Sequence, residues 1–270
     1  MRVQTGHLKR DVLAYVGGIL LMPLIAISPV LLGWVELDSA LGQAGLFCGA
    51  ISPTVVALIL TGRFYGRSRI QVLPRPVASG RRRQTIGLWG LAFILPALFS
   101  WLSLGLYVLI ERSASVSWLI VPGALTLLKS VTISTLGEEW GWRGFLLPQL
   151  QQRLNPLAAG VIVGGCWALW HFWYFLIPGY YTVAFGWFVI DVVGQSLWFT
   201  WLYNRSGGSV WLAVFFHMTG NFWLHWIPLE QLGGTPRTIF AGVNLATGLV
   251  MLLVERKRTR AAPVMAPTDQ

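Results

Sequence analysis

Charged side chains are scarce in this chain. Asp, Glu, Lys and Arg make up only 11% of its 270 residues, whereas soluble domains carry about 25%. Cysteine is scarcer still: Cys48 and Cys166 both lie in apolar segments, which predicts buried small side chains rather than a disulfide or a zinc pair. The sequence also lacks a His-Glu-x-x-His zinc helix and a glycine-rich phosphate loop. These absences argue against an ordinary soluble domain, a zinc-helix protease and a phosphate-binding enzyme.

Apolar sequence is abundant and comes in long runs. Hydrophobic residues make up 55% of the chain, with 15 tryptophans and a mean hydropathy of +0.62. A helix needs about 20 apolar residues to cross a bilayer. The sequence predicts an all-α, polytopic membrane helix bundle of about eight transmembrane helices. The expected spans are 13–34, 40–62, 86–110, 118–147, 157–177, 184–203, 209–227 and 238–254.

Lysine and arginine are distributed very unevenly between the expected loops. With both termini inside, sixteen of the twenty fall in inner segments, seven of them in the loop 63–85, and only Arg112 and Arg237 in outer loops. Basic residues concentrate on the cytoplasmic side of membrane proteins. The pattern predicts a multi-pass protein of the cell membrane with both termini inside. The net charge of +10 is therefore explained by basic residues on the cytoplasmic side of the membrane and does not indicate nucleic-acid binding.

The expected domain organisation is simple. Residues 1–12 form a cytoplasmic N-terminus, 13–254 a single transmembrane helical domain, and 255–270 a cytoplasmic tail. The first apolar run is followed by no small-x-small cleavage site, which predicts an anchor rather than a removed signal peptide. No internal repeat is evident.

Two adjacent glutamates interrupt the fourth expected span. Each carboxylate costs about 2.5–3.5 kcal/mol at the centre of a membrane helix, so their presence indicates a role. Glu139 and Arg143 are four residues apart and are expected to pair on one helix face. Glu138 points about 100° away and is left free to act as a general base. A purely structural ion-pair cluster is the alternative.

Other polar residues lie in the later spans. His171 is surrounded by aromatic residues in sequence, which is also typical of a core histidine. His217 and Asn221 are four apart and share a helix face, where they form either a binding face or interhelical hydrogen bonds. His225 continues the same face near the outer end, where an interfacial histidine is ordinary.

A second set of polar residues has a structural interpretation. Asp191 and Gln195 are four apart in the sixth span, and Lys129 lies in the middle of the fourth. We expect Lys129 and Asp191 to pair, or one of them to line the cavity.

Together these side chains indicate hydrolysis by an activated water. They supply a base, an orienting ion pair, two imidazoles and an amide. No Ser or Cys has an obvious base beside it in sequence. Hydrolysis by water therefore fits better than covalent catalysis.

The pattern resembles the three-motif signature of the CPBP family, the CAAX-protease and bacteriocin-processing (Abi) intramembrane endopeptidases. The motifs are Glu-Glu-x-x-x-Arg at 138–143, aromatic-x-x-x-His at 167–171 and His-x-x-x-Asn at 217–221. Their context is similar to the bacterial branch, so farnesylated CAAX substrates are not expected. Trp167 stands where many members have Phe, and the bulky run 172–175 leaves substrate choice open.

The resemblance implies roles for the first two motifs. Glu138 would activate the water with His171 as its partner. Glu139 and Arg143 would hold the first motif in place.

The role of the third motif depends on whether the site holds a metal ion. The resemblance implies that His217 and Asn221 bind the oxyanion of the tetrahedral intermediate. Glu138, His171 and His217 could instead ligate Zn²⁺ and leave an open position, so the cofactor is either none or zinc. Asn is a poor zinc ligand and a good oxyanion donor, which favours metal-independent chemistry.

Straight helices would not bring these motifs together. At 1.5 Å per residue, Glu138 lies about 30 Å from the start of its span, and His171 about 21 Å from the start of the next. The fourth span must therefore tilt, start deeper, or break around Gly137, Gly141 and Gly144. We expect Glu138, His171, His217 and Asn221 to converge around a cavity in the membrane.

Two other functions remain possible from sequence. A non-catalytic membrane scaffold (a pseudoprotease) would keep the motifs as structure. A small-solute transporter would place ionisable residues along a path across the membrane. For a protease the expected partners are a membrane protein or peptide substrate and the lipid bilayer, and the sequence leaves the oligomeric state open.

Overall fold

The computed structural model describes residues 8–68, 82–112 and 116–261. Within these ranges every regular secondary-structure element is a helix, as predicted. The elements are α1 (Leu8–Leu31), α2 (Ala40–Ala50), α3 (Ser52–Tyr65), α4 (Arg82–Glu111), α5 (Ala124–Gly137), α6 (Glu139–Gly141), the π-helix η2 (Trp142–Leu146), α7 (Leu147–Leu150), α8 (Pro156–Phe175), α9 (Phe185–Arg205), α10 (Val210–Trp226) and α11 (Gly234–Ala261).

Each of the eight predicted segments contains a helix, but two of them are broken, and 118–123 precede the helix of the fourth. The segment 40–62 forms α2 and α3, which meet at Ile51 with a bend of 52°. Pro53 lies in the first turn of α3, where its missing N–H and fixed φ suit a helix start. The segment 118–147 is divided at the first motif.

The helices that carry the second and third motifs begin at well-formed caps. The Asn155 side chain accepts a hydrogen bond from the Ala158 N–H at 3.0 Å, and Pro156 follows at the first helical position of α8. The Ser209 hydroxyl accepts from the Leu212 N–H at 3.2 Å and starts α10. Such side chains satisfy N–H groups that a helix leaves unpaired.

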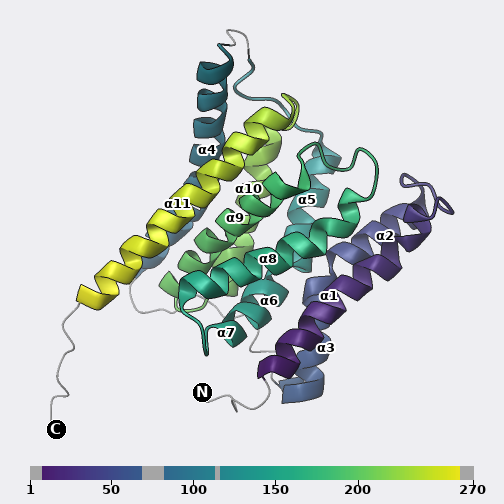
Figure 1. Ribbon diagram of the computed structural model, residues 1–270, viewed down its shortest axis with the longest axis vertical. Coiled ribbons are helices and arrows are strands. Elements are labelled where there is room, and N and C mark those ends of the chain that lie inside the picture. Colours follow the sequence, from purple (N-terminus) through teal and green to yellow (C-terminus); the bar gives the residue numbers. More distant parts are fainter. Residues whose placement is uncertain (1–7, 69–81, 113–115, 262–270) are drawn as a thin grey trace.

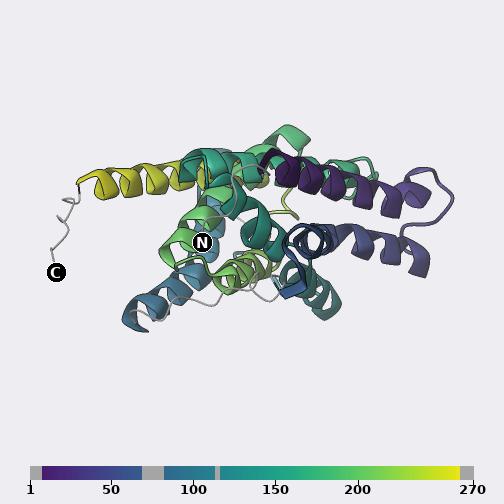
Figure 2. The ribbon, with the colours of Figure 1, turned by 90° about the horizontal axis from the view of Figure 1, so that it is seen from below.

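The short helices of the first motif lie inside the bundle. In Figure 1, α8 crosses the middle of the molecule, with α6 and α7 beside it, α1 to α3 on one side and α11 and α4 on the other. Seen from below, α1 and α11 lie along the same side at opposite ends with α8 between them (Figure 2). The helix α9 packs against α8, α10 and α11.

A glycine lets α9 and α11 approach backbone to backbone. A Cβ at Gly194 would meet the backbone nitrogen of Leu245 and lie 2.6 Å from the carbonyl carbon of Asn244. Small residues permit such close approach between helices in a membrane. Asp191 lies three residues earlier on the same face of α9, so it also faces α11.

Four helices are apolar and long enough to cross a membrane. They are α1, Ile86–Glu111 of α4, α8 and Gly234–Glu255 of α11, and the bent α2–α3 pair could be a fifth span. This supports a multi-pass membrane protein. The count of eight and the inward orientation of both termini stay predictions. Because α9 is enclosed by other helices, most of its surface faces protein.

Some predictions fall at the margins of the described residues. The segments 1–12, 63–85 and 255–270 lie partly outside them.

Both cysteines are free thiols, but Cys48 is exposed and Cys166 only partly buried, so the prediction that both are buried was wrong.

Candidate active site

The first motif lies where α5 breaks. The helix ends at Gly137, and Glu138 has φ −125° and ψ −54°, outside the helical region, before α6 begins at Glu139. The π-helix η2 follows directly at Trp142. Single π turns inside helices occur frequently at functional sites. The break is one of the three solutions expected from sequence, and it turns Glu138 away from the α5 axis.

Gly141 fixes where this broken segment sits. A Cβ at Gly141 would collide with the Tyr15 hydroxyl of α1 and the Pro53 backbone carbonyl of α3. The backbone carbonyl cannot move without moving α3. Glycine is therefore required for α6 to rest against α1 and α3 at this depth.

Glu139 and Arg143 pair as predicted. The Arg143 guanidinium donates to both Glu139 oxygens at 3.0 Å, and both side chains have no exposed surface. The guanidinium also lies 3.9 Å from the centre of the Phe199 ring and donates to the Ser196 hydroxyl at 3.4 Å. Because Ser196 and Phe199 belong to α9, the pair anchors the first motif to that helix. Removing one partner of such a buried pair is strongly destabilising.

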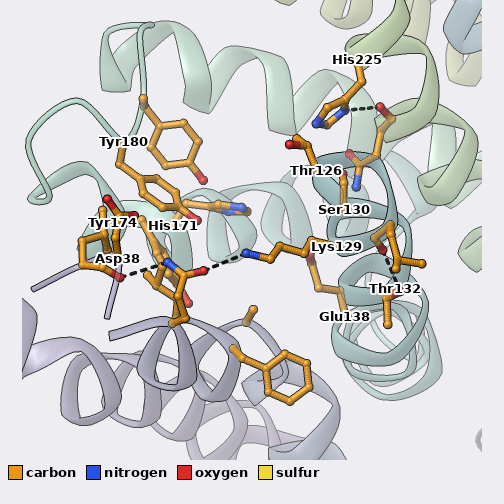
Figure 3. Close-up of a pocket in the computed structure, with 18 of the residues that line it drawn as sticks. Asp38, Thr126, Lys129, Ser130, Thr132, Glu138, His171, Tyr174, Tyr180 and His225 are labelled. Atoms are coloured by element: carbon orange, nitrogen blue, oxygen red, sulfur yellow. Dashed lines mark hydrogen bonds between the residues drawn. The ribbon is translucent and has the colours of Figure 1, made fainter. Parts of the chain in front are cut away.

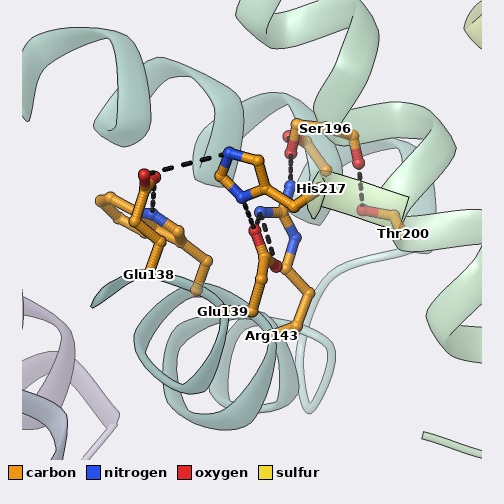
Figure 4. Close-up of polar contacts among 8 residues, drawn as sticks. Glu138, Glu139, Arg143, Ser196, Thr200 and His217 are labelled. Atoms are coloured by element: carbon orange, nitrogen blue, oxygen red, sulfur yellow. Dashed lines mark hydrogen bonds and ion pairs between the residues drawn. The ribbon is translucent and has the colours of Figure 1, made fainter. Parts of the chain in front are cut away.

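His217 lies between the two glutamates, as Figure 4 shows. Its Nδ1 is 2.8 Å from Oε1 of Glu139, and its Nε2 is 3.9 Å from Oε1 of Glu138. Because the Glu139 carboxylate is bound to Arg143, its oxygens are acceptors and the Nδ1–H of His217 donates. Its other ring nitrogen is thereby directed at Glu138. The sequence did not predict this arrangement, in which the first and third motifs are in direct contact.

Two tryptophan N–H groups lie near the Glu138 carboxylate. The Trp142 Nε1–H donates to Oε2 of Glu138 at 3.4 Å. The N–H of the buried Trp167 also lies near the Glu138 carboxylate, but it forms no hydrogen bond of ordinary geometry within the described residues. Neither tryptophan was predicted as a site residue. The four-residue spacing of Glu138 and Trp142 is the one sequence signal for this contact.

His171 is held in one tautomer. Its Nδ1–H donates to the backbone carbonyl of Trp167 at 2.9 Å, and a carbonyl can only accept. The neutral ring therefore carries its lone pair on Nε2. The indole of Trp167 lies between the two imidazoles, with ring centres 6.1 Å from His171 and 5.3 Å from His217.

A cavity of about 780 Å³ brings the motifs to one place. Glu138 of the α5 break, His171 of α8 and Asn221 of α10 all line it, and Figure 3 shows Glu138 and His171 on its wall. His217 lies behind Glu138 beside a second space of about 20 Å³, which Asn221 also lines. Glu138, His171 and Asn221 therefore converge on this cavity as expected, whereas His217 reaches Glu138 from the smaller space. His225 lines the same cavity, with its Nδ1–H donating to the Asn221 carbonyl at 2.7 Å.

The predicted pair of Lys129 and Asp191 was wrong. Lys129 donates to the Gln43 side-chain oxygen at 3.1 Å and lines the cavity, which was the alternative expectation. Asp191 is buried in α9 and accepts from Arg237 at 3.2 Å and from Asn244 at 2.9 Å, both on α11. Arg237 was expected in an outer loop, but it lies buried in the first turn of α11. The Gln195 amide completes this group by donating to Asp191 at 3.0 Å.

The residues considered for zinc do not assemble as a ligand set. Within the described ranges, no three His, Cys, Asp or Glu side chains are placed to hold a metal ion. His217 and His171 each keep Nε2 free, because Glu139 and Trp167 engage only Nδ1, so the placement of the three side chains, not the state of the rings, decides the fit. The arrangement of Glu138, His171 and His217 does not fit a three-ligand centre, and the mechanism below uses no metal.

Comparison with known proteins supports the resemblance. Residues 118–223 match the family model described as type II CAAX prenyl endopeptidase Rce1-like. A curated "CAAX prenyl protease 2" of Methanococcus maripaludis is 26% identical over 152 residues, covering 51% of this chain and 51% of the relative. The match thus spans about half of the relative's length. The similarity to the CAAX-protease group predicted from the motifs is confirmed, and the matched region contains all six predicted site residues.

Proposed function

We propose that this protein is an intramembrane endopeptidase of the CAAX-protease type that hydrolyses a peptide bond with an activated water. Its substrate is a membrane protein or membrane-associated peptide, and its place is the cell membrane of a bacterium. The single observation that supports this best is the position of Glu138. Its carboxylate lies on the wall of a large cavity, next to His217 and in front of the buried Glu139–Arg143 pair.

Glu138 and His171 bind the attacking water. Both line the cavity, and the free Nε2 of His171 accepts a hydrogen bond from the same water. Glu138 removes one proton, and the resulting hydroxide attacks the carbonyl carbon of the scissile bond. When the intermediate collapses, the C–N bond breaks and Glu138 passes this proton to the leaving amine.

His217 and Asn221 stabilise the oxyanion. Two carboxylates, Glu138 and Glu139, lie next to one guanidinium, Arg143. A protonated His217 between the carboxylates makes the group neutral, and buried charges require such pairing. In that state Nε2–H is a donor, and with the Asn221 amide it provides two hydrogen bonds to the developing negative charge.

The test is to compare protein N-termini in membranes of cells that express wild type or Glu138→Gln at equal level. We expect new N-termini that appear only with wild type, because the glutamine amide cannot accept the proton. The purified wild-type protein should then cleave the same sequences in liposomes. Removal of a general base lowers hydrolysis by about 10²- to 10⁴-fold.

A matched control is Glu111→Gln, at the exposed end of α4, which should leave the N-termini unchanged. Identical profiles for wild type and Glu138→Gln, with both proteins folded, would overturn the protease proposal in favour of a scaffold. A change in solute flux without new N-termini would indicate a transporter.

A further inference from the structure

A small internal space lies behind the third motif, between α4, α9, α10 and α11. Its volume is about 20 Å³, and about 10–15 Å³ is enough to hold one water molecule. Three side-chain amides line it, those of Gln195 on α9, Asn221 on α10 and Asn244 on α11. A buried water needs two to four polar partners, so the space has the size and the partners for one water.

Asp191 fixes the orientation of two of these amides. Its Oδ1 accepts from the Gln195 amide at 3.0 Å and from the Asn244 amide at 2.9 Å, and its Oδ2 accepts from Arg237 at 3.2 Å. A carboxylate paired with an arginine only accepts, so both amides turn an N–H towards it. Each amide keeps a carbonyl oxygen that Asp191 cannot use, and that oxygen is available as an acceptor to the space that both residues line.

Close packing of α9 against α11 holds Gln195 and Asn244 in place. A Cβ at Gly194, the residue before Gln195, would lie 2.6 Å from the carbonyl carbon of Asn244. One turn further along, the Trp198 Nε1–H donates to the Thr247 hydroxyl at 3.0 Å and joins the same two helices. The two amides therefore form a rigid wall, as a residue that orients a neighbour requires.

Asn221 lies between the small space and the cavity of the candidate active site, because it lines both. Its amide nitrogen carries two diverging N–H groups, so one can serve each side. If the amide were reversed, a carbonyl oxygen instead of an N–H would face the oxyanion and would repel it. The direction of this amide is therefore decisive for the proposed mechanism.

We propose that one ordered water fills the small space and transmits the orientation set by Asp191 to Asn221. The water donates hydrogen bonds to the carbonyl oxygens of Gln195 and Asn244 and accepts one from an N–H of Asn221. The second N–H of Asn221 is then directed into the large cavity, where the oxyanion forms. Asp191 is thus a positioning residue for the oxyanion site, and this inference rests on the proposed protease function.

The water itself is tested without turnover, by a crystal structure of the full-length chain at a resolution that shows buried waters elsewhere in the bundle. We expect one water within about 2.7–3.2 Å of side-chain nitrogen or oxygen atoms of Gln195, Asn221 and Asn244. A space without ordered water, or a water that does not contact Asn221, would overturn the proposal. This outcome does not depend on whether the protein hydrolyses peptides.

The role of Asp191 is tested by kinetics on a peptide that spans a cut site found in the comparison of N-termini. The combined Asp191→Asn and Arg237→Gln variant removes both buried charges, so neither is left unpaired. An asparagine side chain can donate as well as accept, so it no longer fixes the amides. We expect kcat to fall about ten-fold at unchanged KM, because oxyanion contacts form only in the transition state.

A second variant leaves the buried ion pair intact. Gln195→Met removes one acceptor for the water but keeps Asp191 paired with Arg237. It should give a smaller fall in kcat, again at unchanged KM. Loss of an oxyanion donor itself costs about 10²- to 10³-fold, so both variants should remain more active than Asn221→Ala.

Asn221→Ala also shows whether Asp191 acts through Asn221. In the Asn221→Ala background, the Asp191→Asn and Arg237→Gln pair should lower kcat no further, because the group that it orients is gone. An equal fall in both backgrounds would overturn the proposal and assign Asp191 to stability alone. If no peptide is cleaved at all, the protease proposal fails, and the structure still decides whether the water joins the three amides.

Thr247→Val is the matched control. It removes a side-chain hydrogen bond between the same two helices, but Thr247 is not among the described residues that line the small space. We expect its kcat and KM to equal those of the wild type. A kcat that follows the melting temperature through all of these variants, Thr247→Val included, would show that the group only holds α9 and α11 together.

Discussion

The Nδ1 of His217 lies 2.8 Å from Oε1 of Glu139, across 78 residues of sequence. Glu139 also holds Arg143 with both oxygens at 3.0 Å. One carboxylate therefore fixes a guanidinium and an imidazole at once, and the imidazole in turn faces Glu138. Glu139 is therefore a positioning residue that holds His217 next to Glu138.

Glu139→Gln should damage both stability and activity. The variant leaves Arg143 buried without a counter-charge, so we expect the free energy of unfolding to fall by about 3 kcal/mol. Hydrolysis should fall by about 100-fold, because His217 loses its orientation. Thermal unfolding in detergent and the cleavage rate in liposomes measure the two effects.

The control for this prediction is Glu255→Gln. Glu255 pairs with Arg205 at 3.3 Å, but the Arg205 side chain is 49% exposed. Exposed pairs contribute about 0–1 kcal/mol, so this variant should change little. Equal losses in both variants would contradict the anchoring role of Glu139.

Trp167→Phe should lower activity while preserving the fold. The indole N–H of Trp167 has no partner within the described residues, so its removal leaves no acceptor unsatisfied. It lies near Glu138, where it is available to donate to the catalytic water during the reaction, so its loss should slow hydrolysis about ten-fold. The measurement is the cleavage rate together with the melting temperature.

Trp201→Phe is the matched control for Trp167. It also removes a buried N–H without a hydrogen-bond partner among the described residues, but near Arg205 rather than Glu138. We expect its cleavage rate to stay at the wild-type level. Unchanged activity in Trp167→Phe would assign Trp167 to packing alone.

Gly141→Ala should displace the first motif. The added methyl group would collide with the Pro53 carbonyl and the Tyr15 hydroxyl, and overpacking costs about 1–3 kcal/mol. Because the collision separates α6 from α3, Glu138 moves with it and the cleavage rate falls more than stability alone requires. In Gly165→Ala nothing lies within 4 Å of the new methyl group, so we expect no loss and up to about 1 kcal/mol of stabilisation.

A double-mutant cycle should show which cation, the buried Arg237 or the exposed Lys129, pairs with Asp191. Asp191→Asn should lower the free energy of unfolding by about 3 kcal/mol, because it leaves the buried Arg237 unpaired. We expect the combined Asp191→Asn and Arg237→Gln variant to lose less than the sum of the single variants. Lys129→Gln, combined with Asp191→Asn, should be additive. Coupling between Lys129 and Asp191 in chemical or thermal unfolding would contradict the pairing described above.

Features that depend on nearby residues could be predicted from the sequence. The lengths of the apolar runs predicted where the helices lie. The count of eight spans and their orientation stay predictions. The four-residue spacing of Glu139 and Arg143 predicted their pair, because such neighbours meet on one helix face. The mismatch in depth between Glu138 and His171 predicted that the fourth span must tilt, start deeper or break, and it breaks at Glu138.

The sequence by itself determined an all-helical, strongly apolar chain, one ion pair and the residues that meet at the candidate site. Only the tertiary structure decided which of them touch. His217 contacts Glu139 on the first motif, Lys129 contacts Gln43 of α2, and Asp191 contacts Arg237 of α11. The physical reason is that helical periodicity fixes the face on which a side chain lies, whereas the rotation and depth of each helix depend on close packing. Here that packing includes the approach of Gly141 to Pro53 and of Gly194 to Leu245.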